Sequence, residues 1–431
     1  MTTEALYKLY AEHPVICTDT RKITAGCLFF ALKGENFDGN IFAQKALDDG
    51  AAFAIIDEAG LQKDERYIVV PDVLEALQDL ARFHRRQFDF PVIGITGTNG
   101  KTTTKELFKS VLSQKFKTYA TTGNLNNHIG VPLTLLSLPK DTELAIIEMG
   151  ANHKKEIEFL CTIARPTHGL ITNVGKAHLE GFGGFEGVKT AKGELYSFLK
   201  ENDGVTFINQ DNPHLMKMYG SGNGRVVRYG TLSGDGVKGK IVENDPFLTI
   251  DWFSGERAHR VKTNLTGTYN LENIVAAITV GLFFGLSEDQ INAGINSYIP
   301  GNNRSQIIKT ESNTLICDYY NANPSSMAVA IDNLAAISAN KKTLILGDMF
   351  ELGEDAAAEH KAVLDKALSV DVDERIFVGK EFYHAGNQNN ARFYMTTEDA
   401  FNGLKDNPIT NSVVLIKGSR SMKMETLVEL L

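Results

Sequence analysis

One short segment, residues 92–103 with the sequence VIGITGTNGKTT, constrains the fold more than any other part of the chain. Residues 92–96 are an apolar run that predicts a buried strand, and residues 101–114 place Leu107, Val111 and Leu112 on one face of a helix. A glycine-rich turn between a strand and a helix can aim its backbone N–H groups at phosphate oxygens, and the helix N-terminus adds positive potential. The segment therefore predicts a phosphate loop.

Two side chains in this loop fit phosphate chemistry. Lys101 can reach the terminal phosphates of a nucleotide, and the Thr102 hydroxyl can hold Mg²⁺. The strict pattern G-x-x-x-x-G-K-[ST] is not met, because Ile95 stands five positions before Gly100. The alternative is a glycine-rich turn that caps an ordinary helix. The coincidence of turn, lysine and hydroxyl at one strand-to-helix junction favours phosphate binding.

The rest of the chain alternates between predicted strands and helices, which is typical of α/β layers. A charged connector ends at Pro91, and residues 300–305 (PGNNRS) form a second junction. Residues 224–262 are expected to form antiparallel strands, and residues 270–297 two helices. A chain of 431 residues has room for several domains of ordinary size.

Charge and cysteine usage exclude several classes of protein. The 44 lysines and arginines against 53 aspartates and glutamates give a net charge of −9, which argues against a chain that coats nucleic acid or an anionic membrane. The four cysteines show no C-x-x-C spacing and suit a reducing cytoplasm. The longest apolar run, residues 274–286, is too short to span a membrane and predicts a buried helix.

The TGTNGKTT loop resembles the ATP loop of the superfamily of Mur ligases and folylpolyglutamate synthases. Six further strings strengthen this resemblance, which extends over nearly the whole chain; they lie at residues 123–134, 148–153, 173–179, 318–327, 346–353 and 417–420. The last three, together with GNLNN and EMGAN, resemble the branch of the Mur ligases that adds D-Ala-D-Ala to UDP-N-acetylmuramoyl-tripeptide.

The resemblance implies a three-domain α/β protein. Residues 1–84 would form a small UDP-sugar-binding domain, residues 85–299 a central ATP-binding domain around a parallel sheet, and residues 300–431 a Rossmann-like domain that binds the acceptor. The implied activity is ATP-dependent amide ligation through an acyl phosphate, with ADP and phosphate as products, in peptidoglycan precursor synthesis. ATP and two Mg²⁺ ions would be needed, and the chain is expected to be a cytoplasmic monomer without nucleic acid or membrane partners.

The catalytic and metal-binding residues implied by the resemblance are Lys101, Thr102, Glu148, His178 and Lys192. Glu148 ends an apolar strand, where it could hold Mg²⁺ or instead cap a loop N–H. His178 matches a second metal ligand, although a lone histidine is usually structural or exposed. Lys192 matches the position of a carbamylated lysine in related ligases; without the resemblance it would be taken as a solvated helix lysine.

The resemblance also implies the nucleotide contacts. The loop residues concerned are Gly97, Thr98, Asn99, Gly100, Lys101, Thr102 and Thr103. Asn270 and Asn273 lie one helical turn apart and would face the adenine, unless Asn270 merely caps a helix. Arg304 would approach the phosphates and Asp318 the ribose.

The remaining candidates would bind the two peptide substrates. In the first domain they are Thr20, Arg21 and Lys33, toward the UDP moiety; the alternative for the two cations is ordinary exposed surface. In the second domain they are Asn126, Asn127 and Asn152. In the third domain Asn321, Asn323, Ser419 and Arg420 are expected near D-Ala-D-Ala.

Rival functions are another ligase of the superfamily, a regulatory protein that hydrolyses ATP to change shape, and an inactive scaffold.

Overall fold

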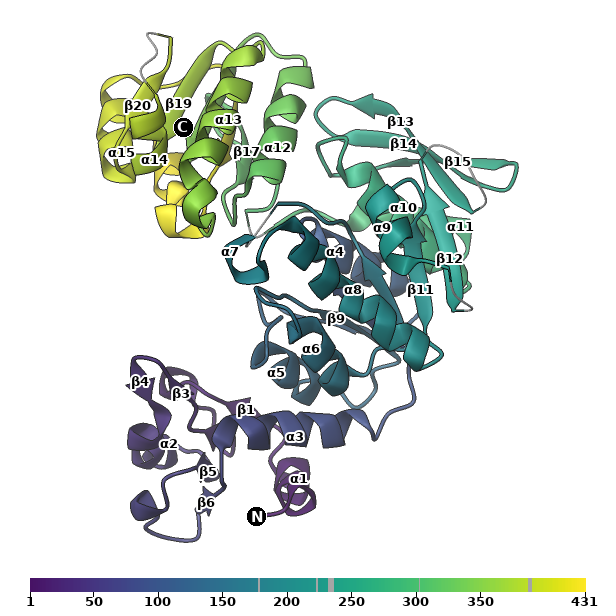
Figure 1. Ribbon diagram of the computed structural model, residues 1–431, viewed down its shortest axis with the longest axis vertical. Coiled ribbons are helices and arrows are strands. Elements are labelled where there is room, and N and C mark those ends of the chain that lie inside the picture. The colour runs from purple at the N-terminus through teal and green to yellow at the C-terminus, as the bar shows by residue number, and fades with distance from the viewer. Residues whose placement is uncertain (177–178, 222–223, 232–235, 302, 387–389) are drawn as a thin grey trace.

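The computed structural model describes residues 1–176, 179–221, 224–231, 236–301, 303–386 and 390–431. Figure 1 shows three bodies along the chain: an N-terminal body in purple, a middle body in blue to teal, and a C-terminal body in green to yellow. Each contains its own sheet flanked by helices. The expected three-part α/β organisation is thus confirmed, while the boundaries at 84/85 and 299/300 stay predictions.

The N-terminal body is built on a four-stranded parallel sheet with the order β1-β2-β5-β6. Its strands and helices are β1 (Ile16–Cys17), β2 (Leu28–Phe30), β5 (Phe53–Ile56), β6 (Tyr67–Val69), α1 (Thr3–Glu12), α2 (Ala43–Asp48) and α3 (Val73–Arg85). A two-stranded ribbon, β3 (Lys33–Gly34) with β4 (Phe37–Asp38), lies beside them. Asp72 caps α3 by accepting from the backbone N–H of Glu75, which sets where this helix begins.

The middle body contains a nine-stranded sheet with the order β15-β14-β13-β12-β11-β10-β7-β9-β8. Its strands are β7 (Val92–Thr96), β8 (Thr118–Ala120), β9 (Leu144–Glu148), β10 (His168–Ile171), β11 (Val205–Asn209), β12 (Arg225–Gly230), β13 (Val237–Asn244), β14 (Leu248–Ser254) and β15 (Arg257–Lys262). Its helices are α4 (Lys101–Leu112), α5 (Gly130–Leu136), α6 (Glu156–Ala164), α7 (Leu179–Phe182), α8 (Phe185–Glu201), α9 (Pro213–Tyr219), α10 (Asn270–Phe283) and α11 (Glu288–Ser297).

The expectation of antiparallel strands over residues 224–262 is correct for β13, β14 and β15 but wrong for β12. β12 pairs in parallel with β11 over residues 205–209 and 225–229. The reason is the intervening helix α9, which carries the chain back across the sheet so that both strands run in the same direction. β12 therefore continues the parallel core of the sheet.

The C-terminal body has a six-stranded sheet with the order β16-β17-β21-β18-β19-β20, parallel except for β16. Its elements are β16 (Gln306–Lys309), β17 (Thr314–Asp318), β18 (Lys342–Gly347), β19 (Glu374–Val378), β20 (Arg392–Tyr394), β21 (Val413–Lys417), α12 (Pro324–Ala336), α13 (Ala356–Ser369), α14 (Lys380–Ala385) and α15 (Thr397–Asp406). This is the Rossmann-like arrangement that was expected. Asp318 and Lys417 end two neighbouring parallel strands, so they lie at the carboxyl edge of the sheet, where ligands bind in such folds.

The N-terminal and middle bodies share one hydrophobic core. A single cluster of buried apolar side chains runs from Leu6 and Leu77 to Val131 and Leu160. Arg85 strengthens this junction by donating to the carbonyl of Ala164 at 3.0 Å. In Figure 1, α3 runs along the middle body beside α5 and α6. The first two bodies are thus joined by packing.

The C-terminal body keeps its own apolar clusters, which among the described residues contain no member from the first 300 positions. Its contacts with the middle body include polar pairs such as Lys176–Glu359 at 2.7 Å and Asn333 with Thr266 at 3.2 Å.

The apolar run at residues 274–286 is largely the buried helix α10, as expected. In the described part of the chain, no helix is long and apolar enough to cross a membrane.

Candidate functional site

The phosphate loop forms as expected between β7 and α4. Gly97 and Gly100 have φ angles of +145° and +78°, which favour glycine. A Cβ on Gly97 would lie 2.0 Å from the Thr172 hydroxyl, so no larger residue fits there without a shift. The loop can therefore present its backbone to a ligand at close range, as a phosphate site requires.

Lys101 is the first residue of α4, and its ammonium lies over the loop. Its Nζ donates to the carbonyls of Gly97 at 2.8 Å and Thr98 at 3.0 Å. Burial lowers the pKa of Lys101 to about 8; Glu148 opposes this shift and Arg304 adds to it. The ammonium is thus held over the loop by two backbone carbonyls, which phosphate oxygens of a bound nucleotide can replace as its partners.

Thr102 and Glu148 form a corner of oxygen atoms beside the loop. The Thr102 hydroxyl donates to Glu148 Oε2 at 2.9 Å, and the Asn126 amide donates to Glu148 Oε1 at 2.9 Å. Both carboxylate oxygens thus face side chains, which disfavours the alternative that Glu148 caps a loop N–H. A hydroxyl and a carboxylate at this separation are the hard oxygen ligands that Mg²⁺ takes.

In the described part of the chain no three His, Cys, Asp or Glu side chains gather into a metal site. The oxygen donors at the corner are therefore few, and phosphate oxygens and water would have to complete the shell of a Mg²⁺ ion, as is common for this metal. The candidate ligand His178 lies outside the described residues.

Lys192 on α8 is buried and points toward the same cavity, so the alternative of a solvated helix lysine is wrong. Its Nζ donates to the carbonyl of Ala151 at 3.4 Å and lies 5.2 Å from the centre of the Phe182 ring. Burial lowers the pKa of Lys192 to about 7, with a further contribution from the charge of Lys101. A large fraction of its amine is therefore neutral near pH 7.

Asn270 and Asn273 join α10 to α4. The Asn273 amide donates to Asn270 Oδ1 at 2.9 Å and accepts from the Thr104 hydroxyl at 3.1 Å. Asn270 donates to the carbonyl of Thr266 at 2.8 Å and is not the N-cap of its helix, a position taken by Tyr269. Both asparagines line the cavity, which is required if both are to face the adenine of a bound nucleotide.

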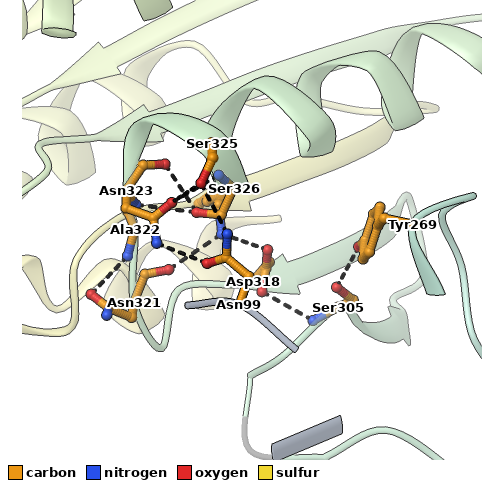
Figure 2. A network of polar contacts seen from close by, with 10 residues as sticks. Asn99, Tyr269, Ser305, Asp318, Asn321, Ala322, Asn323, Ser325 and Ser326 are labelled. Atoms are coloured by element: carbon orange, nitrogen blue, oxygen red, sulfur yellow. Dashed lines mark hydrogen bonds and ion pairs between the residues drawn. The ribbon is translucent and has the colours of Figure 1, made fainter. Parts of the chain in front are cut away.

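The C-terminal body closes the other side of the cavity. Asp318 accepts from Lys417 Nζ at 2.6 Å and from the backbone N–H of Ser305 at 3.2 Å, and Ser305 in turn contacts the Tyr269 hydroxyl at 2.7 Å. Figure 2 shows the contacts of Asp318, Ser305 and Tyr269 beside the loop that carries Asn321 and Asn323. The Arg304 guanidinium stacks over the Tyr320 ring at 3.8 Å. Cations and a carboxylate of this body thus face the phosphate loop.

Together these residues enclose a cavity of about 1030 Å³. The sequence-predicted residues in its lining are Gly97, Thr98, Asn99, Gly100, Lys101, Thr103, Asn126, Asn127, Glu148, Asn152, Lys192, Asn270, Asn273, Arg304, Asp318, Asn321 and Asn323. A cavity of this size fits a nucleotide with part of a second substrate. The structure therefore brings most of the sequence-predicted site into one place.

Six predicted residues in the described part of the chain are not in the lining of this cavity. One of them is Thr102, whose hydroxyl donates to the lining residue Glu148. Arg21 is exposed and pairs with Asp19, Lys33 pairs with Asp57 at 2.8 Å, and both lie with Thr20 in the N-terminal body. Ser419 is buried and accepts from the backbone N–H of Phe350 at 3.2 Å. The Arg420 guanidinium lies 5.1 Å from the centre of the Tyr320 ring. Their binding roles stay predictions.

Sequence reasoning missed three residues that shape the site. Asn173 fixes the phosphate loop by accepting from the backbone N–H of Asn99 at 3.0 Å. Lys417 neutralises Asp318, and Ser325 contacts the Asn99 side chain at 2.9 Å. All three stand inside strings that carry the family resemblance, so the signal was present, but only the fold reveals their partners.

The fold and the site together define a class of protein. It is a three-body α/β protein in which a phosphate loop and the carboxylate of Glu148 face a Rossmann-like domain across a shared cavity. Comparison with protein families agrees. Residues 14–85 match the model "Mur ligase family, catalytic domain", residues 95–281 the "Mur ligase middle domain", and residues 303–420 the "Mur ligase, glutamate ligase domain". The chain belongs to the Mur ligase family.

Within this family the chain is similar to one type over nearly its whole length. It is 36% identical to the UDP-N-acetylmuramoyl-tripeptide–D-alanyl-D-alanine ligase of Bacillus subtilis, covering 96% of this chain and 92% of that protein. Among solved structures it resembles MurF from Acinetobacter baumannii, with 32% identity, a TM-score of 0.87, and coverage of 96% and 92%. It also resembles the MurF ligase of Thermotoga maritima in complex with ADP, with 27% identity, a TM-score of 0.85, and coverage of 96% of both chains. The resemblance inferred from the sequence motifs is confirmed.

Proposed function

We propose that this chain is an ATP-dependent ligase that joins D-Ala-D-Ala to UDP-N-acetylmuramoyl-tripeptide in peptidoglycan precursor synthesis. The observation that carries the proposal is the corner formed by Thr102 and Glu148 beside Lys101; Lys101 and Glu148 line the cavity shared with the C-terminal body. The full-length similarity to ligases named for this reaction supports the choice of substrates.

The chemistry follows from the reacting groups. A carboxylate at neutral pH is a poor electrophile, so it must be activated before an amine can attack it. Transfer of the γ-phosphoryl group of ATP to the terminal carboxylate of the tripeptide gives an acyl phosphate and ADP. The amine of D-Ala-D-Ala then attacks the acyl carbon, and phosphate leaves. Phosphoryl transfer needs positioning and charge neutralisation, which Lys101 and the N–H groups of the loop provide.

Magnesium fits the oxygen donors present, and Thr102 and Glu148 would hold it. Bound there, it would neutralise phosphate charge during transfer. A second ion needs another anionic ligand, and Lys192 supplies one if it is carbamylated. The neutral Nζ attacks the carbon of CO₂, an N–C bond forms, and one proton is released. The lowered pKa of Lys192, caused by burial, favours this step because it raises the fraction of neutral amine.

The three bodies divide the substrates between them in this proposal. Thr20, Arg21 and Lys33 serve the UDP end, whereas Asn126, Asn127 and Asn152 contact the peptide near the cavity. Asn321, Asn323, Ser419 and Arg420 serve the acceptor. His178 is a further metal ligand. The enzyme acts in the cytoplasm as a monomer, where ATP and the UDP-linked precursor are present.

A product assay tests the function directly. The chain is mixed with ATP, Mg²⁺, UDP-N-acetylmuramoyl-tripeptide and D-Ala-D-Ala, and the products are identified by mass. We expect the UDP-pentapeptide with one ADP and one phosphate per turn, and only slow ATP hydrolysis when either peptide is omitted. AMP and pyrophosphate would contradict the acyl-phosphate mechanism. Rapid hydrolysis without peptides would instead favour a regulatory ATPase, and ligation of single amino acids would favour another ligase of the superfamily.

A further inference from the structure

The side chain of Asn99 connects the phosphate loop to the C-terminal body. Its Nδ2 donates to Ser325 Oγ at 2.9 Å, and its Oδ1 accepts from Asn323 Nδ2 at 2.8 Å. Figure 2 shows Asn99 lying against the segment that holds both partners. Because both ends of the Asn99 amide are engaged in this way, its side chain acts here as a bridge between two domains, 224 and 226 positions apart in sequence.

The two partners are themselves held in place. Asn323 is the N-cap of α12, and its Oδ1 accepts from the backbone N–H of Ser326 at 2.9 Å and from Ser325 Oγ at 2.8 Å. Asn99, Ser325 and Asn323 therefore form a closed ring in which each side chain donates once and accepts once. A ring anchored on a helix N-cap is rigid, so it can transmit the position of α12 to the loop.

The loop is held from its other side by the middle body. The backbone N–H of Asn99 donates to Asn173 Oδ1 at 3.0 Å, and its carbonyl accepts from the Thr172 hydroxyl at 2.6 Å. Asn99 stands directly before Gly100 and Lys101, so any movement of Asn99 displaces the lysine that faces the phosphates. The backbone of Asn99 is thus held within the middle body, whereas its side chain is held by the C-terminal body.

We propose that Asn323 and Ser325 are positioning residues for phosphoryl transfer, which act through Asn99 to hold the phosphate loop in its working shape only when the C-terminal body is docked. ATP chemistry would then be favoured when the acceptor-binding domain is in place, and wasteful hydrolysis would be limited. This inference rests on the proposed function.

The alternative is that the ring has only a structural role, as one of several contacts that dock the C-terminal body on the middle body. The interface provides a matched comparison, because the Lys176–Glu359 pair also joins the two bodies, at 2.7 Å, and Glu359 does not line the cavity. Glu359→Gln removes an interdomain ion pair without touching the phosphate loop. A general loss of docking would affect this variant as much as the ring variants.

The test compares Ser325→Ala and Asn323→Ser with Glu359→Gln. Serine at 323 keeps a side-chain oxygen for the helix cap but is too short to donate to Asn99. We expect kcat to fall about three- to tenfold for each ring variant, as for the loss of one neutral hydrogen bond. The Kd for a non-hydrolysable ATP analogue should change less than about twofold in each variant, and the KM for D-Ala-D-Ala should change less than about twofold in Ser325→Ala.

Two results would overturn the proposal: an unchanged kcat in the ring variants, or an equal loss of kcat in Glu359→Gln. A raised KM for D-Ala-D-Ala with an unchanged kcat would assign Asn323 to acceptor binding instead.

Hydrogen–deuterium exchange of the free protein supplies a readout that does not depend on the ligase reaction. The backbone amides of residues 98–101 should exchange faster in Ser325→Ala and Asn323→Ser than in wild type, whereas Glu359→Gln should leave them unchanged. If exchange behaves in this way but the wild-type chain makes no UDP-pentapeptide, the proposed function fails and the bridge stands. Unchanged exchange in the ring variants refutes the bridge whatever the activity.

Discussion

At the scale of single residues, the proposed function gives opposite tasks to two buried lysines. In this proposal Lys101 remains a cation at the phosphate loop, whereas Lys192 loses its proton to become a metal ligand. Burial lowers the pKa of both, to about 8 and about 7. When phosphates bind beside Lys101, its pKa should rise and favour the protonated ammonium, because nearby anions raise the pKa of an ammonium.

Replacing Lys101 with alanine should reduce kcat by about 10²–10³, the range for removal of one preorganised electrostatic contact to a developing charge. The fold should survive, because in the described part of the chain the hydrogen bonds of the Lys101 ammonium go to its own loop. Steady-state kinetics measure the effect, and circular dichroism controls for folding. A well-folded variant with a nearly normal rate would refute the assignment of Lys101 to the phosphoryl group.

Lys192→Ala should be nearly inactive and should regain part of its activity when small carboxylic acids are added, because they can occupy the vacated space as anionic ligands. Lys192→Arg should not be rescued, since it fills the space and keeps a positive charge. Carbamylation needs the neutral amine, so in the wild type it should increase as the pH rises through about 7. Mass spectrometry and rescue kinetics test this. Substantial activity in Lys192→Arg would identify the lysine as an ordinary cation.

At the scale of secondary-structure elements, the junction between α1 and α3 carries a buried histidine. His84 Nδ1 contacts the Tyr7 hydroxyl at 3.3 Å, the ring packs against Tyr10 and Phe88, and its Nε2 has no partner among the described residues. Burial lowers the pKa of His84 from 6.5 to about 4. Protonation would place an unpaired charge inside the packing that joins the first two bodies.

The sign of the pH effect follows from this shift. Between pH 6.5 and 4 the unfolded chain binds a proton at His84 that the folded chain does not, so the free energy of unfolding falls as the pH is lowered. We expect this residue to contribute a loss on the order of 1–2 kcal/mol by pH 4.5. In His84→Phe, thermal unfolding should depend less steeply on pH over this range. The dependence should not vanish, because burial also lowers the pKa of His168 to about 4. An unchanged slope would contradict the prediction.

At the scale of the whole molecule, the two interfaces between bodies differ in kind. The N-terminal and middle bodies share an apolar core, whereas the contacts described between the middle and C-terminal bodies are polar, such as Lys176–Glu359. Separating apolar surfaces is costly in water, but polar pairs can exchange their partners for water at little net cost. The C-terminal body is therefore the one expected to move relative to the other two, about the junction predicted at residues 300–305.

Small-angle X-ray scattering tests this expectation. Adding an ATP analogue together with UDP-tripeptide should change the scattering curve, and a fit in which the C-terminal body rotates against a fixed pair of the other two should describe the change. Curves that stay the same with ligands, or that require the N-terminal body to move instead, would contradict this picture.

The sequence by itself determined the local chemistry of this protein. The phosphate loop was predictable because strand, glycine turn, lysine and hydroxyl are contiguous, and short-range sterics decide their conformation. The same holds for the buried helix α10, whose apolar pattern is local, whereas the Rossmann-like form of the C-terminal domain was implied by the family resemblance. The family resemblance added residues such as Glu148 and Lys192, which no spacing would have singled out.

Only the tertiary structure decided which distant residues meet. The direction of β12 depends on the helix before it, the burial of Lys192 on the packing of α8, and the pairing of Asp318 with Lys417 on two strands 99 positions apart. The ring of Asn99, Asn323 and Ser325 spans two domains. A linear pattern records which side chains can donate or accept, but hydrogen bonds act over about 3 Å. Which donor reaches which acceptor is therefore set by how the domains pack.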